Sequence, residues 1–219
     1  MSETTRHERL IGELAGSLRP VRRLPPPWQR AAWWVALVIA IGVGLVALAG
    51  FDIVRHRLGS SPDAWLAVLG SVLTAPLAAF AAFQTSVPGR SPRWALLPLP
   101  SALLWMAASG VGCLRSWLIP PSPGASGVEP HDCLVFIVCV SLPLAVALVL
   151  MLRRACPLRP GLTATLGGLA SAAAAATLLN LFHPFDVAAT DLAIHAVAIA
   201  LVVLATRALG ARALGRRTT

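Results

Sequence analysis

Cys113 and Cys133 are twenty residues apart and enclose a segment rich in proline and glycine. Two thiols with this spacing could form a permanent disulfide, which would close the loop and stabilise the fold by roughly 3 kcal/mol. They could instead form a reversible redox pair, or a soft metal site completed by His131 and Asp132. The permanent disulfide is the default expectation in an oxidising compartment, and the sequence leaves the other two chemistries open.

A second group of polar residues, His183, Asp191 and His195, could bind a metal ion. Asp191 and His195 are four residues apart, so on a helix they share a face. A titratable side chain within an apolar helix, such as His195, is a functional candidate by default. The alternative is structural: Asp191 could begin the helix as its N-cap, and His195 could hydrogen-bond to a neighbouring helix.

These residues lie at or near the ends of long apolar segments, which indicate a membrane protein. The 219-residue chain is 57% hydrophobic and 12% charged, with a mean hydropathy of +0.75, whereas soluble domains carry about 25% charged residues. This composition excludes a soluble globular protein, a disordered protein and a free nucleic-acid-binding domain. A helix needs roughly 20 apolar residues to cross the hydrocarbon core, so we expect an all-α integral membrane protein built as a six-helix bundle. The six segments are Ala31–Phe51, Ala64–Ser86, Trp94–Cys113, Cys133–Leu152, Leu162–Leu181 and Leu192–Leu209.

Small residues and tryptophans refine this picture of the bundle. Gly168, Ala172 and Ala176 recur at every fourth position of the fifth segment, and small residues at this spacing let helices approach closely. The fifth helix is therefore predicted to lie at the centre. Tryptophans near the segment ends are predicted to be interfacial anchors: Trp28, Trp33, Trp34, Trp65, Trp94 and Trp117.

The arginines predict how the chain crosses the membrane. All 18 basic residues are arginines, and with six spans fifteen of them fall on the side that holds both chain ends. The opposite side holds only Arg55, Arg57 and Arg115. Because positively charged loops stay in the cytoplasm, both termini are predicted to be cytoplasmic. The expected organisation is a cytoplasmic arm (residues 1–30), a transmembrane domain (31–209) and a basic cytoplasmic tail (210–219).

The arm is predicted to contain an amphipathic helix. Four apolar residues fall on one helical face, and Pro20 and the Pro25–Pro27 run then end the helix and form a stiff spacer. The apolar face could lie on the bilayer surface, to which the arginines would also be attracted. It could equally bind in the groove of a cytoplasmic partner, and the pattern favours neither. The residues of this face are Leu10, Ile11, Leu14 and Leu18.

Signs of catalysis or transport are missing from the sequence. The predicted spans contain no acidic residue, whereas ion-coupled carriers usually have one within the membrane. No nucleophile elbow, zinc-protease motif or phosphate-binding loop occurs. We therefore expect no enzymatic activity, no cofactor and no small-molecule substrate.

Several of these segments together resemble a known family. They follow one another along nearly the whole chain: Leu10-Ile11, Leu14-Ala15, Leu18, Pro20–Arg23, Leu73–Ala75, Val87–Ser91, Gly112-Cys113, Cys133, His183-Pro184, Asp186, Asp191-Leu192 and His195. In this order they are similar to the NrsF family of six-span anti-sigma factors of the bacterial inner membrane.

The resemblance implies a regulator whose arm holds an extracytoplasmic-function (ECF) sigma factor at the inner membrane, away from RNA polymerase. It also implies release after heavy-metal or oxidative stress, sensed on the periplasmic side at Cys113 and Cys133. No direct contact with nucleic acid is implied. The partner-binding residues implied for the arm are Leu10, Ile11, Leu14, Leu18, Arg22 and Arg23.

A different class of protein is also compatible with the residues alone. Cys113, Cys133, His183 and His195 could be the working site of a small inner-membrane redox or metal-binding protein. Bound metal or haem in the purified protein, or turnover of a thiol substrate, would favour that alternative.

Signalling from the periplasm requires the arm and the cysteine pair on opposite sides of the membrane. We predict that a reporter active only in the cytoplasm works when fused to the N-terminus and fails when inserted between Cys113 and Cys133, because the arginine distribution sets the orientation. A reporter active only in the periplasm, placed at the same two positions, provides the reciprocal control. Equal activity of one reporter at both positions would refute the topology.

Overall fold

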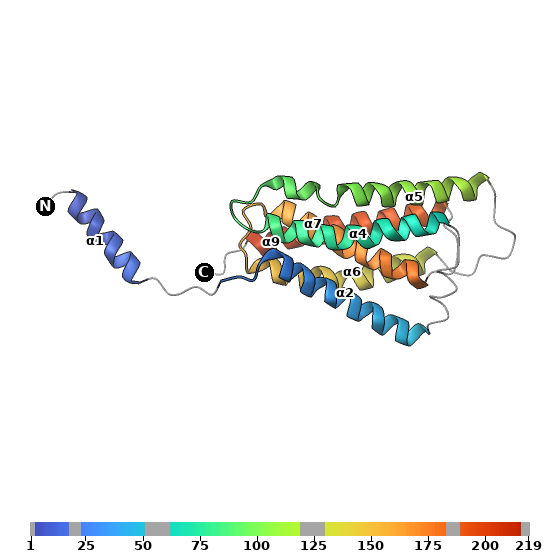
Figure 1. Cartoon of the computed structure of the whole chain (residues 1–219), viewed down its shortest axis with the longest axis horizontal. Helices are drawn as coiled ribbons and strands as arrows, with labels where there is room; N and C mark the ends of the chain where they lie inside the picture. The colour runs from blue at the N-terminus through green and yellow to red at the C-terminus, as the bar shows by residue number, and fades with distance from the viewer. Residues whose placement is uncertain (1–2, 18–22, 51–61, 119–129, 183–188, 216–219) are drawn as a thin grey trace.

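The structure, a computed structural model, describes residues 3–17, 23–50, 62–118, 130–182 and 189–215. Every regular element among these residues is helical, which confirms the all-α class (Figure 1). A separate N-terminal helix precedes a bundle of six long helical segments. The elements are α1 (Glu3–Gly16), α2 (Pro27–Ala49), α4 (Pro62–Thr85), η1 (Pro92–Leu96), α5 (Leu99–Leu118), α6 (Pro130–Arg153), α7 (Pro160–Phe182), α8 (Ala189–Ala205), η2 (Thr206–Gly210) and α9 (Ala211–Gly215).

Six helical segments are long and apolar enough to cross a membrane, as the sequence predicts. Their ends differ from the expected ones most clearly in three segments. In place of one helix over Trp94–Cys113, the third segment consists of the 3-10 turn η1 and helix α5, which runs from Leu99 to Leu118. Helix α2 begins at Pro27 rather than at residue 31, because proline fits the first turn of a helix, where its missing N–H is not needed. The last segment continues past Leu209 to Gly215, through the π-helical turn η2 and α9.

Helix α7 lies at the centre of the bundle, where it packs against α4, α6 and α8. Its inner surface is made of small residues, and Ala172 and Ala176 are almost completely buried. A Cβ atom added at Gly168 would lie 2.9 Å from the Cα atom of Val203 in α8, so the two backbones are nearly in contact there. The prediction of a central fifth helix built on small residues is confirmed.

Helix α4 packs between α7 and α5 and is the second inner helix. A Cβ atom at Gly70 would lie 2.7 Å from the Cα atom of Trp105 in α5. Further along this contact the hydroxyl groups of Thr74 and Ser101 are 3.0 Å apart and hydrogen-bonded, and both side chains are buried. A glycine contact and a hydrogen bond therefore hold α4 to α5, as is common between membrane helices.

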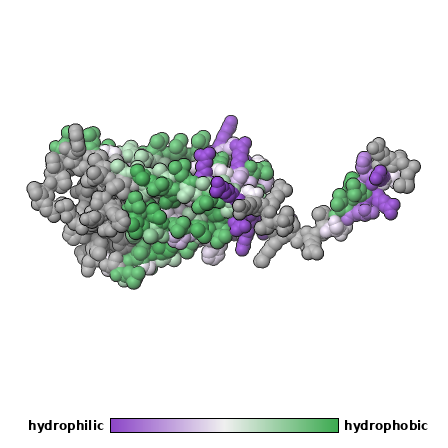
Figure 2. Space-filling model, turned by 180° about the vertical axis from the view of Figure 1, so that it is seen from behind, coloured by the Kyte–Doolittle hydropathy of each residue, from purple (hydrophilic) through white to green (hydrophobic). Residues whose placement is uncertain are grey.

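The middle of the bundle is apolar on the face shown in Figure 2. Large side chains point away from the neighbouring helices, with Leu103, Leu142 and Leu48 exposed to 60%, 63% and 87%. Apolar patches of this extent are unfavourable in water and favourable against lipid tails. Together with the six long helices, this surface indicates a multi-pass membrane protein.

The described tryptophan side chains, which do not include that of Trp117, divide into exposed and buried groups. Trp28, Trp33 and Trp65 are exposed, as an interfacial anchor requires. Trp94 is half-buried and meets the ring of Phe80 edge to face. The prediction for Trp34 is wrong: its side chain is 1% exposed, because its ring faces α6 rather than the membrane surface.

We predict that Gly70→Ala lowers the thermal stability of the protein in detergent, whereas Gly44→Ala leaves it unchanged or slightly higher. The new methyl group at position 70 would overlap the backbone of α5, and overpacking of this kind costs about 1–3 kcal/mol. Gly44 has open space around it, so alanine there only improves helix propensity. Equal melting temperatures for the two variants would contradict the close contact between α4 and α5.

Candidate functional site

The apolar face of α1 is exposed in this structure. Leu10, Ile11 and Leu14 are exposed to 53%, 65% and 58%. Beside this face, Arg9 and Glu13 form an ion pair of 3.5 Å across one helical turn. Leu18 and Arg22, which the sequence analysis adds to this group, lie outside the described residues, and Arg23 is exposed just before α2.

Helix α1 stands apart from the bundle and packs against none of its helices (Figure 1). A helix of 14 residues is marginally stable alone in water, and most helical stability comes from packing of an apolar face. Helix α1 is therefore expected to become more stable when another surface covers its apolar face.

One end of the bundle, the end nearer α1, is strongly basic (Figure 2). The segments that form it, residues 23–30, 86–98, 153–160 and 206–215, contain no Asp or Glu. We call this end of the bundle the basic end. Its exposed arginines are Arg23, Arg90, Arg93, Arg153, Arg154, Arg159, Arg207 and Arg212.

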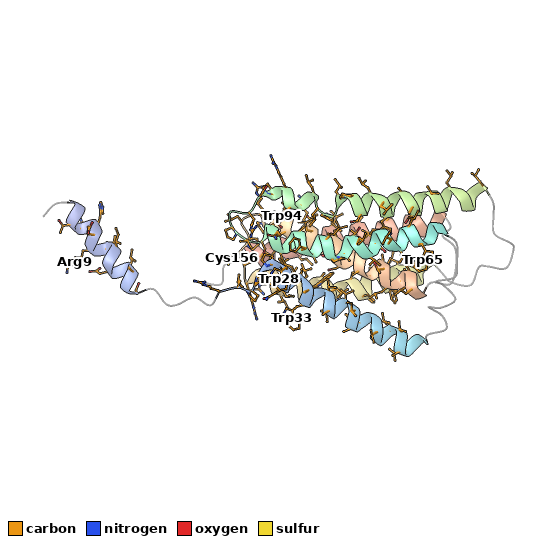
Figure 3. All side chains as sticks on the ribbon, viewed as in Figure 1. Arg9, Trp28, Trp33, Trp65, Trp94 and Cys156 are labelled. Atoms are coloured by element: carbon orange, nitrogen blue, oxygen red, sulfur yellow. The ribbon has the colours of Figure 1, made fainter. Side chains whose placement is uncertain are left out.

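The first turns of α2 are fastened to α6 at this basic end. Arg30 donates a hydrogen bond to the carbonyl oxygen of Met151, and its guanidinium carbon lies 4.5 Å from the centre of the Phe83 ring in α4. One turn further, Nε1 of Trp34 donates to the carbonyl oxygen of Leu144 at 3.1 Å. Figure 3 shows the neighbouring Trp28 at this end of the bundle.

The sequence alone does not predict this arrangement. Arg30 falls at the end of the predicted cytoplasmic arm (residues 1–30) and Trp34 among the predicted interfacial anchors, and the structure buries both side chains. Their spacing of four residues at the start of an apolar segment was the available signal, since it places them on one face. Which face turns inward depends on the neighbouring helices.

The two sensor candidates are at the end of the bundle opposite to the basic end. Cys113 lies in the last turns of α5 and Cys133 in the first turn of α6, and their side chains are outside the described residues. In the described part of the chain, α5 and α6 do not pack along each other, whereas α8 packs against both. A bond between Cys113 and Cys133 would therefore join two helices that otherwise share α4 and α8 as neighbours.

The side chains of the candidate metal site are not among those that the structure describes. His183 lies outside them, and for Asp191 and His195 the structure gives only the backbone, in the first turns of α8. These turns are at the same end as the two sensor candidates, because α8 runs antiparallel to α7 from that end (Figure 1). No three His, Cys, Asp or Glu among the described side chains are close enough to hold a metal ion.

The other two cysteines are free and exposed. Cys139 lies in the middle of α6, six residues after Cys133. Cys156 lies in the turn after α6 at the basic end, where it adopts a positive φ of 48° (Figure 3).

Comparison with known families identifies the family of the chain. The family described as negative regulator of sigma F, NrsF, matches residues 14–215. The chain belongs to the NrsF family. This membership indicates a negative regulator of a sigma factor, in a family named for regulation rather than for catalysis. No curated protein and no solved structure matches the chain.

The NrsF match includes the whole bundle and both sensor candidates, but it begins at Leu14. Leu10 and Ile11 lie before it, so their assignment to the partner-binding face depends on their exposure in α1.

Proposed function

We propose that this NrsF-family protein is an anti-sigma factor of the bacterial inner membrane that holds an ECF sigma factor through its cytoplasmic N-terminal arm. The observation that carries the proposal is the exposed apolar face of α1, which precedes a six-helix bundle in a chain of a sigma-factor-regulating family. Binding at the membrane keeps the sigma factor from RNA polymerase, so its target genes stay silent.

The arm binds its partner as an amphipathic helix in a groove. Leu10, Ile11 and Leu14 supply the apolar contact, and Leu18 extends it by one turn. Since a lone helix of this length is marginal, the partner's groove also provides the packing that keeps α1 folded. Arg22 and Arg23 pair with acidic residues of the sigma factor beside the groove.

The basic end of the bundle offers a second contact to the same partner. Eight exposed arginines without a neighbouring carboxylate in their segments favour an acidic surface. A partner that touches both α1 and the basic end is bound bivalently, so its retention depends on how the arm is held relative to the bundle.

Release begins at Cys113 and Cys133 in the periplasm, where a heavy metal or an oxidant changes the bond between them or their ligands. Such a change makes or breaks the link between α5 and α6 at the two cysteines, and so shifts the relative positions of these helices. A switch of this kind needs two arrangements of the bundle that differ in their affinity for the sigma factor.

We predict that Leu14→Asp abolishes co-purification of the sigma factor from solubilised membranes, because a carboxylate in the apolar contact would have to be desolvated. Gly12→Asp is the matched control: it adds the same charge to the same helix, two residues away on the opposite face. Binding should fall at least tenfold for Leu14→Asp alone. Wild-type recovery of the sigma factor with Leu14→Asp would refute the arm as the binding element.

A second prediction concerns the sensor. Cys133→Ser should remove the response of a sigma-dependent reporter to heavy metal and oxidant, because serine forms neither a disulfide nor a soft metal ligand. Cys139→Ser, six residues along the same helix, is the matched control and should respond as wild type does. A normal response of Cys133→Ser would exclude the thiol pair as the sensor while leaving the binding function intact.

A further inference from the structure

Arg30 is a buried cation without an acidic partner. Its side chain is 5% exposed, and among the described residues no carboxylate forms an ion pair with it. Its guanidinium group instead donates a hydrogen bond to the end of another helix. Met151 lies in the last turn of α6, where carbonyl groups have no partner within the helix and the helix dipole is negative.

The guanidinium therefore makes two favourable contacts at one place. It donates to the Met151 carbonyl oxygen at the C-terminal end of α6, and it packs 4.5 Å from the centre of the Phe83 ring. Lysine has neither the planar shape nor the forked donors for this combination. The site is specific for arginine rather than for positive charge.

Trp34 repeats the attachment one turn further along α2. Its Nε1 atom donates to the carbonyl oxygen of Leu144, seven residues before Met151 and hence on the same face of α6. At Gly42 an added Cβ atom would lie 2.9 Å from the side chain of Leu178 in α7, and beyond it Val43 and Leu48 are exposed to 63% and 87%. Both side-chain bonds from α2 to α6 thus lie at the end from which the arm emerges.

We propose that Arg30 and Trp34 form a latch that couples α6 to the cytoplasmic arm, and that opening this latch releases the partner. The inference rests on the proposed function for the identity of what is released. In the closed state both side chains bind carbonyl groups of α6. In the open state the two side chains move to the membrane surface, where headgroups and water solvate arginine and tryptophan well.

Helix α6 connects the two places that this switch needs. It carries Cys133 in its first turn and the Met151 carbonyl in its last, about 27 Å apart at the rise of an α-helix. Pro143 lies within α6, directly before Leu144, and removes one hydrogen bond of the helix. The half of α6 that carries the latch can therefore tilt relative to the half that carries the cysteine.

Opening the latch weakens binding without changing α1 itself. Once the start of α2 is no longer fixed to α6, the point where the arm joins the bundle moves relative to the basic end. A partner held by both surfaces then experiences a lower effective concentration of the second surface, and it dissociates faster.

Amide hydrogen exchange of the full-length protein in lipid nanodiscs, without any partner, tests the latch. In Arg30→Gln we expect exchange in the first turns of α2 and the last turn of α6 to rise about tenfold or more, the effect of losing a charge-assisted hydrogen bond. Arg93→Gln is the control, because Arg93 is exposed at the same end of the bundle. Unchanged exchange in Arg30→Gln would overturn the latch.

A sigma-dependent reporter in cells then tests its regulatory role. Arg30→Gln should raise expression without any stimulus and show little further rise with oxidant, and Arg30→Lys should restore little of the repression. Raised exchange together with wild-type repression would overturn the inference, since the contact would then be structural only. Because the exchange measurement uses no sigma factor, a failed arm assignment and a failed latch give different results.

A second variant, Trp34→Phe, tests the latch if Arg30→Gln does not accumulate in the membrane. Phenylalanine preserves the buried ring and removes only the donor to Leu144, so exchange and basal expression should rise in the same direction by a smaller factor. Trp33→Phe is its control, because Trp33 is 72% exposed. Equal behaviour of the two phenylalanine variants would overturn the latch.

Discussion

Within a bilayer the hydrophobic effect does not draw helices together, because lipid tails are as apolar as leucine side chains. Helices must therefore be held by close packing and by hydrogen bonds. In this bundle the central helix α7 meets that requirement with glycine and alanine, which bring its backbone next to those of its neighbours. Around it, α4, α6 and α8 form the tightly packed part of the molecule.

Helix α2 is attached in a different way, and its position follows from the same constraint. It packs mainly against α4, and its first turns add directional bonds from Arg30 and Trp34 to backbone carbonyl groups of α6. Directional bonds are lost after a small displacement, whereas packed surfaces adapt gradually. Of the contacts that hold α2, these two bonds therefore respond most sharply to movement of α6.

The sequence predicted the parts of the fold that depend on composition along one helix. Segment length and hydropathy gave the six helices, and the spacing of Gly168, Ala172 and Ala176 gave the central one. Contacts between helices were not predictable in this way. Trp34 met every criterion of an interfacial anchor, and its burial became evident only once α6 was placed beside it.

The arginines illustrate why the site was harder to predict than the fold. The rule that orients the chain counts every arginine equally, because insertion responds to the sum of charges near the membrane. The structure separates them: Arg93 and Arg154 face outward, whereas Arg30 is buried against Phe83 and the end of α6. An arginine three residues into a helix can reach the headgroups as easily as a neighbouring carbonyl group. The same side chain can therefore count toward the predicted orientation of the chain or bind a neighbouring helix, and only the placed helices show that Arg30 binds α6.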